Sequence, residues 1–185
     1  MFELPPISEF IRVFWLYIIK PFWWLWAICL GIILIKLGFT YLLKWIEERK
    51  RIRWLKEHKT LEEFKTLDPR EFEKIVAVIF KNLGYKAQLK GGPKDRGIDI
   101  GIIKDKKRYF VQCKKMDVVS PKFIREFYGS IVDNLREGEK GFLVTTGEFT
   151  EEGREFAKDK PIELVDGSKL EKVANQKILD CLLLG

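Results

Sequence analysis

Three polar side chains that could hold a divalent metal and activate a water molecule lie in two neighbouring apolar segments. Asp99 stands between Gly97 and Gly101, and Gln112 and Lys114 follow in the next apolar run. Carboxylate and amide oxygens are hard ligands that suit Mg²⁺ or Mn²⁺. A neighbouring lysine can hold or deprotonate an attacking water and steady the charge that develops on a phosphate. The pattern therefore indicates metal-assisted hydrolysis of a phosphate ester.

Strand periodicity predicts how these residues face one another. Residues 98–103 and 109–114 read as two strands of a hairpin joined by a charged turn at 104–107. Because strand side chains alternate, we expect one face of the first strand to carry Ile98, Ile100 and Ile102, and the other to carry Gly97, Asp99 and Gly101. Gln112 and Lys114 share one face of the second strand. The flanking glycines would leave room beside Asp99 for an ion or a phosphate.

A capped helix before these strands supplies another carboxylate. Asp68, Pro69 and Glu71 form a strong helix start, and an apolar stripe at helical spacing continues to about Leu83. Glu73 lies on this helix. By itself, such a glutamate is more often a solvated surface carboxylate than a functional one.

The remaining pattern indicates an α/β fold. A further strand is expected at 85–90, before the hairpin, and the chain then alternates between helices from Ser120, Thr150 and Ser168 and strands at 141–146 and 162–165. The order α-β-β-β-α-β-α-β-α predicts a mixed central sheet flanked by helices. About 115 residues are enough to bury a core of that size.

Composition excludes several kinds of site. The formal net charge is +7, but residues 1–59 hold ten basic and five acidic residues, so most of the excess lies beside an apolar segment and is weak evidence for nucleic acid. His58 is the only histidine, so histidine chemistry is nearly excluded. The three cysteines lack metal-ligand spacing, which argues against zinc and against a disulfide framework.

The N-terminal segment reads as a membrane anchor, residues 1–46, in contact with a lipid bilayer. Residues 22–43 carry one charge, Lys36, and as a helix would span roughly 30 Å. Residues 7–19 are apolar but short, and could form an interfacial helix or a second span. Basic residues concentrate after the span, in a charged juxtamembrane linker at 47–66. This asymmetry predicts a protein of the cell membrane whose C-terminal domain, residues 67–185, lies in the cytoplasm.

Several short motifs occur in a specific order. Phe72-Glu73, Gly97-Ile98-Asp99 and Gln112-Cys113-Lys114 resemble the catalytic domain of Mrr-type restriction endonucleases. That family belongs to the PD-(D/E)xK nuclease superfamily, in the branch that has glutamine at the second acidic position. The resemblance covers about Leu67 to Val173 and implies a restriction-endonuclease-like αβββαβ core.

The resemblance also implies roles for individual residues. It implies a metal ion, Mg²⁺ or Mn²⁺, held by Asp99, Gln112 and the backbone carbonyl of Cys113, with Glu73 contributing from the helix and Lys114 assisting the nucleophilic water. Nucleases of this fold often act in pairs, so the resemblance favours a homodimer. Candidate contacts to DNA are the basic residues Arg96, Lys107, Arg108, Lys115, Lys122 and Arg125.

The predicted function is a membrane-anchored, Mg²⁺-dependent DNA endonuclease that hydrolyses phosphodiester bonds, in restriction of foreign DNA or in DNA processing. The alternative is a non-catalytic membrane-tethered module that binds nucleic acid or protein on the same fold. A transporter component is disfavoured, because one or two spans with a single intramembrane lysine provide little of a pathway.

Overall fold

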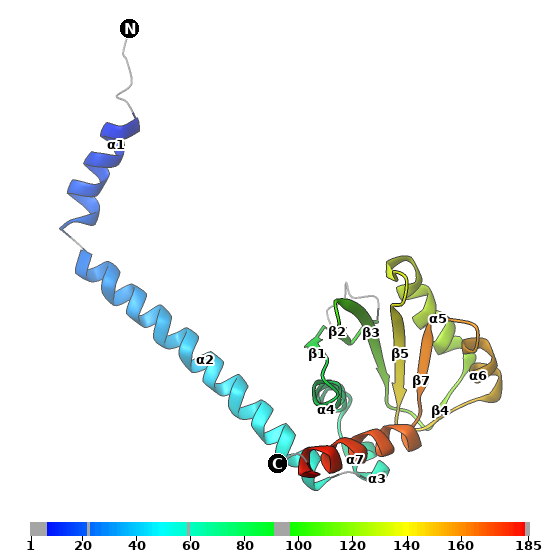
Figure 1. Cartoon of the computed structure of the whole chain (residues 1–185). Coiled ribbons are helices and arrows are strands. Elements are labelled where there is room, and N and C mark those ends of the chain that lie inside the picture. Colours follow the sequence, from blue (N-terminus) through cyan, green and yellow to red (C-terminus); the bar gives the residue numbers. More distant parts are fainter. Residues whose placement is uncertain (1–6, 22, 59, 91–96, 184–185) are drawn as a thin grey trace. The chain divides into compact units, whose positions relative to one another are not determined.

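The computed structural model describes residues 7–21, 23–58, 60–90 and 97–183, in two compact units, 1–49 and 50–185 (Figure 1). The first unit contains α1 (Ile7–Phe14), which a π-helical turn (Trp15–Ile19) extends. These two elements occupy the range predicted for a short apolar helix. A long helix, α2 (Trp23–Glu57), begins in the first unit and ends in the second.

Helix α2 has 35 residues and contains a window of mean hydropathy 2.0, none of it buried. Among the described residues, α2 is the one helix that is long and apolar enough to cross a membrane. The long apolar N-terminal helix predicted from the sequence is therefore confirmed. It continues past the predicted span end at residue 43 without a break, into the charged segment.

A five-stranded mixed sheet forms the centre of the second unit. The main elements of this unit are, along the chain, α3 (Leu61–Thr66), α4 (Pro69–Asn82), β1 (Lys86–Leu89), β2 (Ile100–Lys104), β3 (Lys107–Lys114), α5 (Pro121–Ile131), β5 (Lys140–Thr145), α6 (Glu151–Ala157), β7 (Ile162–Val165) and α7 (Gly167–Leu183). The strand order in the sheet is β1-β2-β3-β5-β7, in which β1, β2 and β3 are antiparallel neighbours and β3, β5 and β7 are parallel. The predicted mixed sheet flanked by helices, with its αβββαβ core, is confirmed.

Two apolar clusters, one on each side of the sheet, form the core. The first joins α4 and α7 to the sheet through residues such as Phe72, Ile100, Val111 and Leu170. The second joins α5 and α6 to the sheet through residues such as Ile124, Phe127, Leu143 and Ala157. The sheet is thus the middle of three layers, because each of its faces buries apolar side chains.

Local interactions explain where these elements begin and turn. The Asp68 side chain accepts hydrogen bonds from the backbone N–H groups of Arg70 and Glu71 at the start of α4. Between β2 and β3, Asp105 and Lys106 have φ angles of +50° and +63°. Such a pair of positive φ values matches the tight hairpin turn whose twist suits antiparallel strands. The charged turn predicted at 104–107 is therefore shorter than expected, and both strands extend into it.

The segment predicted as a linker contributes to the core of the second unit. Leu55, near the end of α2, and Phe64, in α3, are almost completely buried. The Trp54 ring stacks on the His58 ring with centroids 4.7 Å apart and also contacts Phe64. Residues 50–66 therefore stabilise the fold of this unit as well as linking it to the apolar helix.

Two short strands were not expected from the sequence. β4 (Val118–Val119) pairs in parallel with β6 (Glu148–Phe149), in a second, two-stranded sheet. Two residues are too few for an alternating pattern to stand out, so only the tertiary pairing reveals them.

Gly147 joins these short strands to the main sheet. Its N–H donates to the Thr145 hydroxyl, and a Cβ at this position would overlap the backbone carbonyl of Asp117. Because a backbone atom cannot move aside cheaply, Gly147→Ala is expected to destabilise the protein by about 3 kcal/mol. The control Gly129→Ala, at a helical position with open space, is expected to stabilise it by about 0.5–1 kcal/mol. Denaturant titration of both variants measures the difference, and equal stabilities would contradict it.

Candidate active site

Asp99 lies directly before β2, at an irregularity of the ladder. Its N–H donates to the carbonyl of Val111 at 3.0 Å, while Val111 is also the register partner of Ile100. Two consecutive residues therefore oppose one, as in a β-bulge. The alternation breaks here: Ile98 packs in the cluster with α5 and α6, whereas Ile100 and Ile102 pack in the cluster with α4. The prediction that the three isoleucines share one face was wrong, because a sequence pattern does not show a bulge.

A backbone hydrogen bond fixes the Asp99 carboxyl group. Its Oδ2 accepts from the N–H of Cys113, with an N to O distance of 2.7 Å. Burial raises the pKa of Asp99 above its ordinary value, although this hydrogen bond and the positive charge of Lys114 partly oppose the rise. Asp99 is thus held in place by β3 in a poorly solvated position.

Glu73 of α4 lies close enough to Asp99 for their charges to interact. Burial raises the pKa of Glu73, and the negative charge of Asp99 raises it further. Burial, followed by the charges of Asp99 and Glu73, also raises the pKa of the Cys113 thiol well above its ordinary value. Glu73, Asp99 and Cys113 therefore gather on the side of the sheet that α4 covers.

Gln112 has a buried polar atom without a partner. Its Nε2 donates to the carbonyl of Gly97 at 2.7 Å, while Oε1 is buried and accepts no hydrogen bond from the described part of the chain. Gly97 has φ +80°, and a Cβ there would lie 2.7 Å from Gln112 Nε2, so glycine is needed on both counts. A buried acceptor without a donor costs free energy, which a cation beside it would recover.

Lys114 ends β3, and its ammonium lies 5.4 Å from the centre of the Phe123 ring. The structure thus places Glu73, Asp99, Gln112, Cys113 and Lys114 at one end of β3. Within the described ranges, no three His, Cys, Asp or Glu side chains form a metal-holding group. A divalent ion would therefore need amide and carbonyl oxygens besides carboxylates, and the orphaned Gln112 Oε1 fits that requirement.

The candidate DNA contacts are distributed over the whole unit. Arg96 lies outside the described residues. The Lys115 ammonium donates to the backbone carbonyl of Leu67, which gives this lysine a structural contact near the site. Lys122 and Arg125 lie on the exposed side of α5, and the Arg125 guanidinium is 5.2 Å from the centre of the Phe156 ring.

Lys107 and Arg108 lie at the opposite end of β3 from Lys114. Arg108 and Lys114 are six residue steps apart along the strand, which corresponds to roughly 20 Å. Arg108 is paired with the buried Glu139 at 3.4 Å. Burial alone would raise the pKa of Glu139, but hydrogen bonds from Arg108 and Arg136 hold it below its ordinary value. These two cations therefore do not reach the Asp99 cluster from their strand positions.

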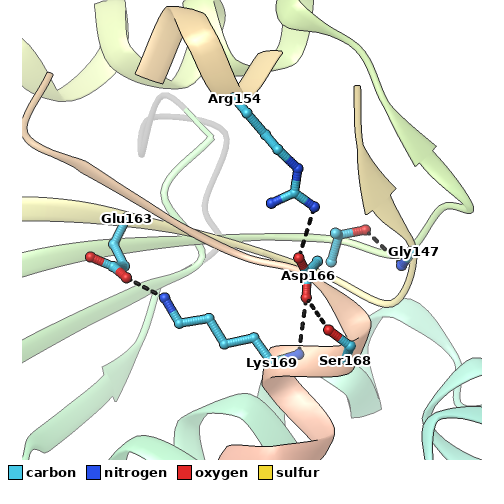
Figure 2. A network of polar contacts seen from close by, with 7 residues as sticks. Gly147, Arg154, Glu163, Asp166, Ser168 and Lys169 are labelled. Atoms are coloured by element: carbon cyan, nitrogen blue, oxygen red, sulfur yellow. Dashed lines mark hydrogen bonds and ion pairs between the residues drawn. The ribbon is translucent and has the colours of Figure 1, made fainter. Parts of the chain in front are cut away.

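A second polar network surrounds Asp166, between β7 and α7 (Figure 2). Asp166 accepts hydrogen bonds from the Arg154 guanidinium, the Ser168 hydroxyl and the backbone N–H of Lys169, each at 2.9 Å. Lys169 also pairs with Glu163. Every member has a partner, and Asp166 satisfies an N–H group in the first turn of α7, so the network explains the helix start rather than a catalytic site.

The raised carboxyl pKa values at the site predict a dependence of stability on pH. Because folding favours the neutral forms of Asp99 and Glu73, their contribution to stability is complete below their ordinary pKa values of 3.8 and 4.5 and is lost as pH rises through the raised values. In EDTA, Asp99→Asn keeps an acceptor for the Cys113 N–H and removes the charge. Its Tm is therefore expected to exceed that of the wild type by a few degrees at pH 7, and by less at pH 4. A Tm difference that is independent of pH would contradict this assignment.

Comparison with known proteins identifies the second unit. Residues 64–174 match the Mrr catalytic family, described as restriction endonuclease. Among solved structures, AF1548, a protein of unknown function, is 19% identical with TM-score 0.51, over 62% of this chain and 67% of that chain. The DNA modification-dependent restriction endonuclease AspBHI is 18% identical with TM-score 0.50, over 75% of this chain and 39% of that chain.

At these identities, the structural likeness shows the fold alone. The MspJI restriction endonuclease, solved in complex with a 27-mer oligonucleotide, is 23% identical with TM-score 0.45, over 72% of this chain and 34% of that chain. This chain thus spans between one third and two fifths of the two restriction endonucleases. No curated protein matches it. Because the family match covers more than half of the sequence, this chain belongs to the restriction endonuclease family of the Mrr catalytic type.

Proposed function

We propose that this protein is a membrane-anchored, Mg²⁺-dependent DNA endonuclease that hydrolyses phosphodiester bonds. The observation that carries the proposal is the set of groups at one end of β3: two carboxyl groups with raised pKa values, and a buried amide oxygen that has no donor among the described residues. Each of these groups would gain from a cation, because it would neutralise the carboxylates and satisfy the amide oxygen. The family membership makes DNA the expected substrate.

Each residue of the cluster has a role in the proposed reaction. Asp99 and Gln112 would bind Mg²⁺ through their side-chain oxygens, and Glu73 would add a carboxylate from α4. The Cys113 N–H holds the Asp99 carboxyl group in position through a 2.7 Å hydrogen bond. When bound, the metal would polarise the scissile phosphate and promote ionisation of a water molecule.

Lys114 would act on the attacking water. It ends the strand that carries Gln112 and Cys113, and its charge acts on Asp99. An ammonium in that position can orient the water and stabilise the negative charge that develops on the phosphate. The contact of Lys114 with the Phe123 ring limits the directions in which the side chain can extend.

We further propose that α2 crosses the cell membrane and that the nuclease unit lies in the cytoplasm. Trp23, Trp24 and Trp26 are exposed near the start of α2, where they suit a membrane interface. Basic residues concentrate near its other end, which favours a cytoplasmic position for that end. Restriction of foreign DNA is consistent with such a position. A homodimer is part of this proposal, since pairs of nuclease domains can cut both strands.

Cleavage by the full-length protein in lipid tests the nuclease. Modified and unmodified plasmid DNA are incubated with Mg²⁺, Mn²⁺ or EDTA, and nicked and linear products are measured. We expect cutting with either metal and none in EDTA. Binding of DNA that is equal with and without metal, and without cleavage of any substrate, would instead support a non-catalytic module. Carbonate extraction of membranes tests the anchor, since a spanning helix stays in the pellet.

A further inference from the structure

A groove of about 260 Å³ lies on the sheet surface formed by β1, β2 and β3. Gly101 and Phe110 line its centre, and the side chains of Lys86, Lys90 and Arg108 lie around it. The absence of a side chain at Gly101 lets Lys90 lie across β2: a Cβ there would be 3.1 Å from Lys90 Cε. The whole groove belongs to the nuclease unit.

The strand register places the groove on the same sheet face as Gln112 and Lys114. Lys86 pairs with Ile103 and Gln88 with Gly101, so Lys86, Gln88 and Lys90 share a face by alternation. On β3, Phe110, Gln112 and Lys114 alternate onto one face, and Phe110 is in register with Gly101. The groove therefore lies on the sheet face that also carries Gln112 and Lys114.

This surface is open over β1 and β2. Helix α4 packs on β1, β2 and β3 from the other side, where Ala87 and Ile102 contact its cluster. Helix α5 packs on β5. Lys86, Gln88 and Lys90 are exposed, on a strand at the edge of the sheet. A ligand as wide as a nucleic-acid strand can therefore reach the groove from the solvent.

The charge of the groove suits a polyanion. Of the described residues that line it, three are cations and none is a carboxylate. Among the residues that the structure describes, no acidic group pairs with Lys86 or Lys90; the Lys90 ammonium instead lies 5.9 Å from the centre of the Phe110 ring. Arg108 shares its charge with Glu139, so the two lysines carry most of the free positive charge. Two lysines without acidic partners on one face, roughly 13 Å apart along the strand, favour binding of phosphates along a nucleic-acid backbone.

One end of the groove lies beside the backbone of Asp99. The Lys90 N–H donates to the Asp99 backbone carbonyl at 2.7 Å, whereas the Asp99 carboxyl group is held by the Cys113 N–H on the side that α4 covers. The groove therefore leads toward Gln112 and Lys114, which lie on its own face of the sheet. From Asp99 to Ile103 the strand extends roughly 13 Å, which matches about four nucleotides of a B-DNA strand at 3.4 Å each. We propose that this groove, defined by Lys86, Gln88, Lys90, Gly101, Arg108 and Phe110, binds the phosphate backbone of the DNA strand next to the cleaved bond. This inference rests on the proposed nuclease function.

Binding of DNA in EDTA tests the groove without cleavage. Full-length protein in nanodiscs of neutral lipid is titrated with a fluorescent DNA duplex at several salt concentrations. The double variant Lys86→Gln with Lys90→Gln is compared with Lys158→Gln with Lys172→Gln. The second pair removes the same charge from exposed positions, one directly after α6 and one in α7. We expect the groove variant to bind about tenfold more weakly and to reduce the slope of log K against log salt by about 2, since each phosphate contact contributes roughly 0.9. The control variant is expected to bind as the wild type does.

Three outcomes would overturn the proposal that the groove binds DNA. The first two are equal DNA affinities of the two double variants and no DNA binding by the wild type. The third is a loss of DNA affinity that appears only with anionic nanodiscs, which would assign the lysines to lipid headgroups. Melting curves of both variants check that exposed substitutions leave the fold intact. Absence of cleavage with every metal would overturn the nuclease proposal instead, because the EDTA measurement does not require catalysis.

Discussion

Asp99→Asn is expected to reduce DNA cleavage by about 1,000-fold or more at saturating Mg²⁺. A bound metal contributes several kcal/mol of stabilisation to the transition state, and each 1.4 kcal/mol changes the rate tenfold. The variant keeps the size of the side chain and an acceptor for the Cys113 N–H, so the change is confined to the charge. Initial rates of plasmid nicking measure the effect.

A matched control separates this effect from a general loss of negative charge. Asp133→Asn changes the same residue type at an exposed position after α5, near the Asn134 carbonyl that accepts from Arg108 at the far end of β3. We expect its rate to stay within twofold of the wild type. The rate of plasmid nicking by Lys114→Ala is expected to fall by a factor comparable to that of Asp99→Asn. Nicking by Asp99→Asn at the wild-type rate would remove this residue from the reaction.

Metal binding gives a second readout that does not depend on turnover. Mg²⁺ or Mn²⁺ is expected to raise the Tm of the wild type and of Asp133→Asn, since a ligand that binds only the folded state stabilises it. Asp99→Asn is expected to lose this increase while melting at a higher temperature in EDTA. A metal-induced increase of equal size in Asp99→Asn would place the ion elsewhere.

Leu55→Ala is expected to destabilise the nuclease unit by about 2–5 kcal/mol, the range for truncating a buried leucine. Leu55 is 2% exposed and packs in the cluster with α4, although it precedes the family match at residue 64. For a unit of this size, the loss corresponds to a decrease in Tm of about 10 °C. Thermal unfolding of the full-length protein in lipid, followed by circular dichroism, measures it.

Leu89→Ala provides the matched control, because Leu89 is 42% exposed on the edge strand β1. Its Tm is expected to change by less than about 3 °C. The same packing predicts that a fragment starting at Thr60 melts below one starting at Lys50, since only the longer fragment contains Leu55. Equal melting temperatures would show that the end of α2 adds nothing to the core.

Short-range patterns were sufficient to predict most of the elements. The sequence displays directly those patterns that involve residues close together in the chain. Examples are the Asp68 cap, the apolar stripe of α4 and the alternating residues of β2 and β3. The membrane-length helix follows from composition for the same reason. The ordered motifs around Glu73, Asp99 and Gln112 were sufficient for the family resemblance, which the match over residues 64–174 supports.

The sequence by itself thus determined the order of the helices and of the five strands of the main sheet, and the long apolar helix, and it supplied the candidate site residues. Only the tertiary structure decided the bulge at Asp99, the unpaired oxygen of Gln112, the burial of Leu55 and the open cationic groove. The physical reason is the distance along the chain between the residues that interact. Helix caps and alternation depend on neighbours in the chain, whereas a bulge, a missing hydrogen-bond donor and a buried side chain depend on residues that folding brings together from distant positions.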